Sequence, residues 1–417
     1  MDELPKTVPS MKQSRFVINS YQFPKTKMTA SINSKAELDR SVDPADFVHT
    51  GPGTLAGRYI RRTWQPIYES AKLAKGKVVP IRILSENLAL YRGESGLPHV
   101  VSNECPHRLT VLSTGWVEGE TIRCRYHGWR YDESGKCVEQ PAEAKPFFAR
   151  VPKLASYPTH EAHGLIFAYF GEGEAPAFRP LPGLEDGARE GWTVSASVEM
   201  LPCNWFQSAE NIMDDVHVNF SHQGHFVNTV ARPFIPTKTA GRETPFGLTQ
   251  LQERGDKTDQ IHFIMPNQCF LGHALRTARD DKPFWFKALF WYVPIDDENH
   301  LHVLIMVYHT KRRDRPEATP VHEEVEAILS GRKCWDDVAK HPNLIRIQDG
   351  VQICGQGKIV DRSRELLGTS DVAVSMLRRL WRRELELLAS GKPVTQFGTM
   401  DPQAIRQEEL EAMGANA

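Results

Sequence analysis

Two short segments of the chain each bring one cysteine and one histidine close together. The first, Cys105–Arg108, reads CPHR. The second, Cys124–Trp129, reads CRYHGW, so the combined spacing is C-x-H, sixteen residues, C-x-x-H. Thiolates and imidazoles are common protein ligands of iron and zinc. The sequence therefore predicts a metal centre held by two loops, with four candidate ligands: Cys105, His107, Cys124 and His127.

The mixture of residue types within each loop distinguishes between two kinds of centre. A Rieske [2Fe–2S] cluster takes two cysteines on one iron and two histidines on the other, and its potential lies at roughly −150 to +300 mV. A structural Cys₂His₂ zinc site usually takes both cysteines from one loop and both histidines from the other. Because each loop here supplies one of each, the order favours the Rieske cluster, a one-electron carrier. A zinc site and four unconnected residues are the alternatives.

A second group of candidate ligands lies in Glu210–His222, which reads ENIMDDVHVNFSH. It contains the pattern D-x-x-H-x-x-x-x-H, formed by Asp214, His217 and His222. Two imidazoles and one carboxylate make the facial triad of non-haem Fe(II) oxygenases, which leaves coordination positions open. The alternative is an amphipathic helix with histidine and aspartate on its surface, and His225 is a further candidate ligand.

The spacing of this segment constrains its structure. Asp214 and His217 are three residues apart and would share one face of a helix. His217 and His222 are five residues apart, which is about 140° around a regular helix, so they converge only if the helix bends or ends between them. Asn219 and Ser221 are weak helix formers. We therefore expect His222 to lie just beyond the end of a helix.

The elements that must position the cysteine–histidine loops are β-strands. Between about residues 78 and 168, short apolar runs alternate with glycine-containing turns, a pattern typical of a small all-β domain. A short helix over Leu55–Trp64 is expected to precede them. The expected strands are Val79–Leu84, Leu88–Tyr91, Val100–Ser102, Thr121–Arg123 and Leu165–Tyr169.

The rest of the chain mixes helices and strands. Asn204–Val218 has helical character, whereas Leu248–Ile264 and Phe284–Tyr308 are rich in strand formers. Asp371–Ala389 carries an apolar stripe at spacings of three and four residues, which predicts an amphipathic helix. The predicted fold class is α+β, with three parts: an N-terminal extension (1–50), a small all-β Rieske domain (51–170), and a catalytic domain (171–417) with an antiparallel sheet flanked by helices.

The composition is that of a soluble globular protein. The 417 residues are 40% hydrophobic and 25% charged, and the formal net charge of −1 gives no basic footprint for nucleic acid. The N-terminus has no apolar signal-peptide core, and no apolar run is long enough to span a bilayer. Seven cysteines in a long chain argue against a disulfide scaffold. We therefore expect a cytoplasmic protein that binds neither nucleic acid nor membranes.

Together the two motifs resemble a known family. CPHR followed by CRYHGW is similar to the Rieske domain of aromatic ring-hydroxylating and O-demethylating oxygenases, and Glu210–His222 is similar to the iron-site helix of that family. The resemblance spans roughly residues 50–395. It implies that the cluster is held by Cys105, His107, Cys124 and His127, and that mononuclear Fe(II) is held by His217 and His222.

The resemblance also implies a third iron ligand. Family members carry this aspartate in a helix ahead of the C-terminal region, and the matching residue is Asp349 in Ile347–Gln352 (IQDGVQ). Its rivals are Asp336, Asp337 and Asp361.

The same resemblance implies how electrons reach the iron. Asp214 is expected to link His217 to the cluster histidine of an adjacent subunit, which by the family pattern is His127. The subunits are expected to form a head-to-tail homotrimer. No G-x-G-x-x-G fingerprint of a nicotinamide or flavin site is present, so a separate ferredoxin and/or NAD(P)H-dependent reductase is expected to supply the electrons.

The substrate is expected to be a small aromatic acid that reacts with O₂. Gly355–Asp371 resembles the phthalate-dioxygenase-like branch, although Gly355–Gly357 departs from it, and Gly115–Gly119 and Val138–Glu143 resemble a subgroup that O-demethylates the lignin-derived biaryl 5,5′-dehydrodivanillate. The resemblance therefore implies monooxygenation that removes an O-methyl group. The alternatives are ring hydroxylation or dihydroxylation of a phthalate-like acid, and a Rieske electron carrier without oxygenase activity.

Several side chains are candidates for the substrate pocket. Aromatic candidates, which more often pack in a core, are Phe270, Phe284, Trp285 and Trp291. Arginines that could pair with a substrate carboxylate are Arg232, Arg242 and Arg276.

Overall fold

The computed structural model describes most of the chain from residue 43 onward, so most of the expected N-terminal extension lies outside the described residues. His225 and Arg232 also lie outside them, as do the side chains of Arg276, Phe284 and Trp285. The described residues are 43–179, 181–184, 192–222, 238–254, 257–277, 280–308, 319–398 and 400.

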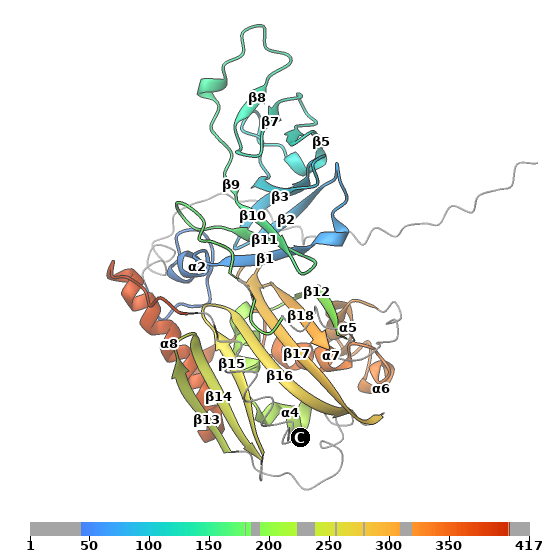
Figure 1. Cartoon of the computed structure of the whole chain (residues 1–417), viewed down its shortest axis with the longest axis vertical. Coiled ribbons are helices and arrows are strands. Elements are labelled where there is room, and N and C mark those ends of the chain that lie inside the picture. Colours follow the sequence, from blue (N-terminus) through green and yellow to red (C-terminus); the bar gives the residue numbers. More distant parts are fainter. Residues whose placement is uncertain are drawn as a thin grey trace, which may run out of the picture.

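Short antiparallel strands make up the first half of the described chain, as expected (Figure 1). Three sheets have the strand orders β1-β11-β10, β2-β3-β4-β9 and β5-β6-β7-β8. Their strands are β1 (Trp64–Glu69), β2 (Val78–Ile83), β3 (Glu86–Arg92), β4 (Pro98–Ser102), β5 (Trp116–Glu118), β6 (Thr121–Arg123), β7 (Arg130–Tyr131), β8 (Cys137–Glu139), β9 (Ser156–Tyr157), β10 (Thr159–Ala162) and β11 (Leu165–Tyr169).

The helix that precedes these strands, α2 (Leu55–Ile60), is shorter than the expected Leu55–Trp64. It begins after Thr54, whose hydroxyl oxygen accepts a hydrogen bond from the Gly57 amide at 3.1 Å, a typical N-cap. It ends early because Trp64 already belongs to β1, which pairs with β11. Short 3₁₀ turns connect the strands at Ser70–Lys72, Leu112–Thr114 and Phe148–Arg150.

A seven-stranded antiparallel sheet, in the order β12-β18-β17-β16-β15-β14-β13, forms the centre of the second half. β12 pairs with β18 without a register shift, from Thr193 opposite Tyr308 to Leu201 opposite His300. The strands are β12 (Thr193–Leu201), β13 (Lys238–Thr244), β14 (Gly247–Arg254), β15 (Lys257–Ile264), β16 (Gln268–Thr277), β17 (Asp280–Pro294) and β18 (His300–Tyr308).

Helices flank this sheet, which confirms the predicted α+β class. α8 packs on β13 and β14, α3 packs on β17, and both α3 and α4 contact α7. The helices are α3 (Trp205–Asn211), α4 (Val216–Ser221), α5 (Val321–Leu329), α6 (Trp335–Val338), α7 (Leu344–Gly355) and α8 (Val372–Ala389), with 3₁₀ turns at Arg362–Arg364 and Thr369–Asp371. None of the helices in this described part is long and apolar enough to cross a bilayer.

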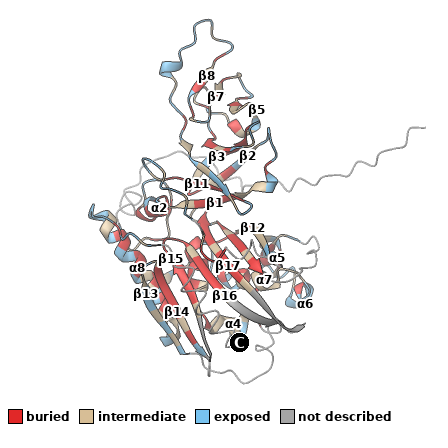
Figure 2. Cartoon of the chain, viewed as in Figure 1, coloured by how far each residue is buried: buried red, intermediate tan, exposed pale blue. Residues whose placement is uncertain are grey.

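The long C-terminal helix α8 matches the predicted amphipathic helix. Leu377, Trp381 and Leu385 of its apolar stripe are fully buried, while Arg382 on the opposite side is exposed, as the burial colours show (Figure 2). The Trp381 ring packs against Tyr59 of α2, with centroids 5.2 Å apart. This stripe therefore joins α8 to the first half of the chain.

The central sheet has two different faces, because side chains alternate along each strand. Phe270 and Trp291 lie in the main hydrophobic core, and Trp291 meets Phe167 of β11 with ring centroids 5.9 Å apart. On the other face, His300 hydrogen-bonds Ser208 of α3 at 2.8 Å. Phe270 and Trp291 thus serve as core residues, and Arg242 is exposed on β13.

Candidate metal centres

Two histidines of α4 and its C-terminal end converge with an aspartate of α7 that lies far away in the sequence. The Nε2 atom of His217 lies 3.4 Å from Oδ1 of Asp349, and Nε2 of His222 lies 3.2 Å from the same oxygen. One ligand atom from each residue lies within 4.8 Å of the other two. Two imidazoles and one carboxylate on one point are the donor set of a non-haem Fe(II) site.

The local backbone explains how two histidines five residues apart can converge. α4 ends at Ser221, and His222 is its C-cap residue with φ −101° and ψ 26°. The expectation that His222 lies just beyond a helix is therefore met. The expectation that Asp214 and His217 share a helix face is wrong, because the helix is interrupted between α3 and α4 and Asp214 lies in that break.

Each histidine is oriented by a hydrogen bond at its other ring nitrogen. Nδ1 of His217 donates to the main-chain oxygen of Asp214 at 2.5 Å. Nδ1 of His222 donates to Oε1 of Gln348 at 3.0 Å. These partners orient each ring so that Nε2 faces Asp349, and such outer partners of ligating histidines are typical of metal sites. Asn211 also donates to Oδ1 of Asp349, at 3.3 Å.

The charges of the three groups are coupled. Burial alone would raise the pKa of Asp349, but the hydrogen bonds from His217 and His222 outweigh it and hold that pKa well below its usual range. Burial would lower the pKa of His217, but Asp349 outweighs it and raises the pKa. The group therefore favours an ionised carboxylate beside the two imidazoles, and a bound cation would take the place of the protons on Nε2.

Asp214 occupies a different environment. Burial raises its pKa, although His217 opposes the shift. One carboxylate oxygen accepts a hydrogen bond from the Val216 amide at 3.0 Å, and the other lies 3.9 Å from Nδ1 of His217. Asp214 thus contacts His217 at Nδ1, the ring nitrogen that faces away from Asp349.

Two of the three rival aspartates serve as local caps. Asp337 accepts a hydrogen bond from the Cys334 amide at 2.8 Å, and Asp361 accepts one from the Ser363 amide at 3.2 Å. Neither belongs to the His217–His222–Asp349 group, nor does Asp336.

The first candidate centre lies at the tips of two loops in the β-rich half. Cys105 and Cys124 are each about 1% exposed, and a hydrogen bond from the Cys105 thiol lowers the pKa of Cys124 to about 6. The rings of His107 and His127 lie 4.5 Å apart and are half-buried. The thiols thus form one pair and the imidazoles another, which fits a two-iron cluster with cysteines on one iron and histidines on the other.

Backbone hydrogen bonds shape the second of these loops. The Gly128 amide donates to the Cys124 carbonyl at 3.0 Å, and the Cys124 amide donates to the Trp129 carbonyl at 2.8 Å. Gly128 has φ 74°, and a Cβ at this position would lie 2.8 Å from Cγ of Pro141. This tight turn therefore requires glycine.

Two aromatic side chains contact candidate ligands of the cluster. The Trp129 indole stacks on the His107 ring at 4.4 Å and 4°. The Tyr131 hydroxyl lies 3.1 Å from Sγ of Cys105. A hydroxyl directed at a ligand sulfur stabilises negative charge on that sulfur and so helps to set the potential of a cluster.

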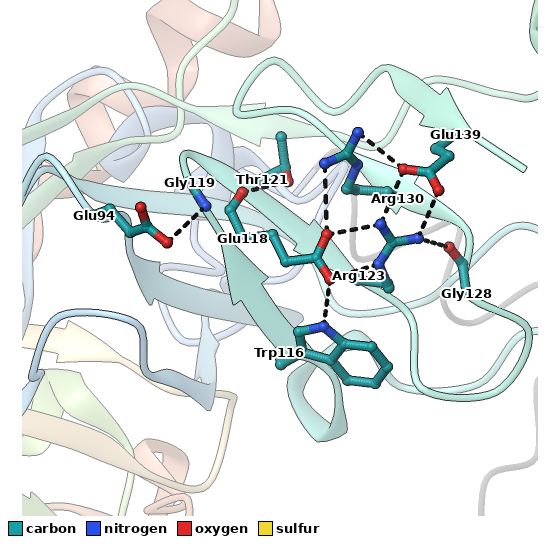
Figure 3. Close-up of polar contacts among 9 residues, drawn as sticks. All are labelled: Glu94, Trp116, Glu118, Gly119, Thr121, Arg123, Gly128, Arg130 and Glu139. Atoms are coloured by element: carbon teal, nitrogen blue, oxygen red, sulfur yellow. Dashed lines mark hydrogen bonds and ion pairs between the residues drawn. The ribbon is translucent and has the colours of Figure 1, made fainter. Parts of the chain in front are cut away.

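An ion-pair network beside the cluster holds the second loop in place (Figure 3). Nη1 of Arg123 donates to the Gly128 carbonyl at 2.7 Å. Nη2 of Arg123 donates to Glu118 at 2.7 Å and to Glu139 at 2.9 Å. Arg130 contacts the same two carboxylates. The network thus ties the loop to β5, β6, β7 and β8.

Sequence reasoning did not find several of these supporting residues. Gln348 stands next to a candidate ligand, but nothing in its local sequence indicates a bond to a histidine 126 residues away. Tyr131 and Arg123 flank the Cys124 motif, yet their contacts depend on the pairing of the strands β6 and β7.

Comparison with known proteins identifies the class. Residues 63–158 match the family model of the Rieske [2Fe-2S] domain. One relative is 31% identical over 380 residues, and the match covers 86% of this chain and 81% of the relative's chain. The chain therefore belongs to the Rieske non-haem iron oxygenases, as an oxygenase subunit. It is an oxidoreductase whose cofactors are a Rieske [2Fe–2S] cluster and a mononuclear iron.

That relative is the 5,5′-dehydrodivanillate O-demethylase oxygenase subunit of Sphingobium sp. (strain NBRC 103272 / SYK-6). The 3-chlorobenzoate-3,4-dioxygenase oxygenase subunit of Comamonas testosteroni is 30% identical, over 81% of this chain and 86% of that protein. The solved structure of dicamba monooxygenase bound to dicamba has the same fold, with a TM-score of 0.57 and 17% identity over 80% of this chain and all of that chain.

Proposed function

We propose that this chain is the terminal oxygenase of a multicomponent enzyme that removes a methyl group from a methoxylated aromatic acid of the 5,5′-dehydrodivanillate type. The observation that carries the proposal is the convergence of His217, His222 and Asp349 on one point in a chain that also carries a Rieske domain. The relative at 31% identity, an O-demethylase subunit by name, supports the substrate class.

In this proposal each candidate ligand has a role. The cluster is held by Cys105, His107, Cys124 and His127, and the mononuclear iron by His217, His222 and Asp349. The donor types fit both groups. Asp214 is a positioning residue whose main-chain oxygen and carboxylate both face Nδ1 of His217.

The chemistry has a simple balance. The bound iron supplies the activation of O₂. One oxygen atom enters a C–H bond of the methoxy group to give a hemiacetal, and the other leaves as water after uptake of two electrons and two protons. The hemiacetal then separates into a phenol and formaldehyde. The protein must hold the methyl group beside His217, His222 and Asp349 and must keep bulk water away.

The shape of the chain supports assembly into a homotrimer. Figure 1 shows β5, β7 and β8, which adjoin the cluster loops, at one end of the long axis, whereas α4 lies toward the other end. Electrons would therefore pass from His127 of one subunit to Asp214 of the next, and a head-to-tail ring is the closed arrangement that gives every subunit such a neighbour. Enzymes of this family take their electrons from ferredoxin or reductase partners.

A second candidate function is dihydroxylation of an aromatic ring. It is favoured by the 30% identity to a subunit named as a 3-chlorobenzoate-3,4-dioxygenase. The two functions differ in their products, because a dioxygenase places both oxygen atoms in the ring and releases no formaldehyde.

The test is product analysis with a surrogate reductase, NADH and ¹⁸O₂. With 5,5′-dehydrodivanillate, we expect one formaldehyde for each phenol formed, with one labelled oxygen in the organic products and one in water. A doubly labelled diol without formaldehyde would contradict demethylation and support ring dihydroxylation.

Metal analysis of the purified protein tests the two centres. We expect about three irons per chain. About two irons would indicate an electron carrier without the mononuclear site, and zinc would indicate a structural zinc site.

A further inference from the structure

One face of the central sheet presents an apolar wall beside the iron-ligand segment. Leu271, Ala288 and Leu304 are buried at its centre, on β16, β17 and β18. Ile212, which lies two residues before Asp214 in the break between α3 and α4, packs against them. The half-buried side chains of Phe286, Phe290 and Met306 complete the wall.

His302 is the polar member of this face. It lies on β18 directly opposite Tyr292 of β17. Its ring is nearly parallel to that of Phe290, with centroids 5.5 Å apart and planes at 10°, and to that of Tyr292, at 5.4 Å and 18°. Asp349 is near enough to contribute to the electrostatic environment of its ring. His302 therefore borders the apolar wall on the face of the sheet that carries Phe290 and Leu304.

Within the part of the chain that the structure describes, neither ring nitrogen of His302 has a hydrogen-bond partner. The neighbouring His300 is different: its Nδ1 bonds the Cys203 carbonyl and its Nε2 bonds the Ser208 hydroxyl, both at 2.8 Å. His300 is fully buried, whereas His302 is half-buried. His300 thus has a structural role, and His302 keeps its hydrogen-bonding capacity for another molecule.

The surroundings of His302 select the kind of group it can bind. Burial and the nearby Arg346 lower the pKa of His302 to about 3, so its imidazole is neutral, with one donor and one acceptor nitrogen. The guanidinium of Arg346 already pairs with Glu199 at 2.5 Å and with Ser197 at 3.0 Å. A neutral hydroxyl is therefore a better match than a carboxylate, which would lose hydration without gaining a cation.

We propose that His302 is a specificity-determining residue that binds the phenolic hydroxyl of a substrate ring packed on this wall. The assignment rests on the proposed function. In a ring with hydroxyl and methoxy groups on adjacent carbons, a hydroxyl held by His302 directs the neighbouring methoxy group toward Asp349. His302 thus selects which methyl group is presented for oxidation, and it acts by positioning the substrate.

The test compares two ligands that differ only at this hydroxyl. Vanillate carries it, and veratrate carries a methyl ether in its place. Their dissociation constants are measured by calorimetry on the oxidised, iron-loaded protein. We expect the wild type to bind vanillate about tenfold more tightly, the effect of one hydrogen bond. In His302→Phe, which keeps an aromatic ring beside Phe290 and Tyr292, the ratio should fall to about one.

Two further variants make the outcome decisive. His302→Gln keeps a hydrogen-bonding side chain and should retain part of the preference. His160→Phe is the matched control, because the His160 ring is also stacked on a phenylalanine, Phe178, with centroids 4.0 Å apart. His160 lies on β10, away from the central sheet, so this variant should keep the wild-type preference for vanillate. Iron content and the EPR signal of the reduced cluster report that each variant is folded.

The results separate this assignment from the proposed function. A preference for vanillate that persists in His302→Phe, or that is absent from the wild type, overturns the role of His302 even if 5,5′-dehydrodivanillate is demethylated. A wild type that demethylates neither 5,5′-dehydrodivanillate nor vanillate overturns the proposed function and this assignment with it.

Discussion

At the scale of single residues, the candidate iron site depends on atoms that do not face the metal. Nδ1 of His217 is held by the Asp214 carbonyl and Nδ1 of His222 by Gln348. Each bond fixes the direction of the ring, so both Nε2 atoms face Asp349. The geometry of the candidate site is therefore set by residues outside it.

Gln348→Leu should weaken iron binding by about 10–100-fold, the usual effect of losing an outer partner of a ligating histidine. The variant keeps the size of the side chain but removes the oxygen that accepts from Nδ1 of His222. Competition with a calibrated Fe(II) chelator measures the change. Gln348→Glu, which retains an acceptor oxygen, is the matched control, and equal iron retention by Gln348→Leu and wild type would disprove this role.

Tyr131→Phe should lower the reduction potential of the cluster by about 40 mV, which corresponds to one hydrogen bond of roughly 1 kcal/mol in a one-electron couple. The phenolic hydroxyl, 3.1 Å from Sγ of Cys105, stabilises the more negative reduced cluster, so its loss favours the oxidised form. A redox titration followed by EPR gives the potential. An unchanged value would show that the hydroxyl does not donate to that sulfur.

The residue types and spacings of the candidate ligands were readable from the sequence, because two-histidine and cysteine–histidine patterns are local. The position of His222 just beyond a helix also followed, because five helical residues turn the chain by about 140° and the two histidines converge only if the helix bends or ends between them. The role of Gln348 did not follow, since it requires α7 to pack against α4. Nor did that of His302, because only the structure shows that, among the described residues, its ring nitrogens have no partner while those of His300 have two.

At the scale of elements, the strands and α8 were predicted well, and the helical segment around Asp214 was predicted poorly. Short apolar runs and amphipathic patterns indicate which residues are buried, so Thr121–Arg123 and Leu165–Tyr169 were located from the sequence. The break between α3 and α4 carries no proline or glycine. It is stabilised from outside, by a hydrogen bond from Gln250 of β14 to the Met213 carbonyl at 2.8 Å.

The network of Figure 3 predicts a pH-dependent contribution to stability. Arg123 and then Trp116 lower the pKa of Glu118 to about 2, from a usual value of 4.5. A carboxyl with a lowered pKa stabilises the fold above its unfolded pKa and loses that contribution as the pH falls toward its folded pKa. Glu118→Gln should therefore be less stable than the wild type at pH 7, by about 1 kcal/mol or less for this accessible site.

Thermal unfolding at a series of pH values measures this contribution. The difference between Glu118→Gln and wild type should be constant near neutral pH and should narrow as the pH falls below 4.5. Glu94→Gln is the control, because the Glu94 carboxylate accepts only a long hydrogen bond from Gly119, at 3.3 Å. A difference that grows on acidification would refute the assignment.

At the scale of the whole molecule, the exposed side chains around the cluster loops are unusual for a solvent-facing surface. Leu109 is 65% exposed and Tyr126 is 55% exposed, each within two residues of a candidate cluster histidine. Apolar groups gathered at such a tip are typical of contact surfaces. They are consistent with the proposed docking of each cluster on a neighbouring subunit.

Light scattering should give a particle mass near three times the 47.2 kDa of one chain. Dilution or mutation that separates the subunits should leave the cluster reducible by the reductase and abolish substrate turnover, because the electron would lose its path to Asp214. The EPR signal of the reduced cluster and product formation follow the two steps. A monomer with full turnover would exclude the ring.

The distance along the chain between the iron-site residues has a consequence for biosynthesis. His222 and its partner Gln348 are separated by 126 residues, and the strands β13 to β18 lie between them. Both cluster loops are complete once Trp129 has left the ribosome, whereas the iron pocket needs almost the entire nascent chain. The order of synthesis therefore makes the cluster loops available for assembly before the candidate iron ligands can come together.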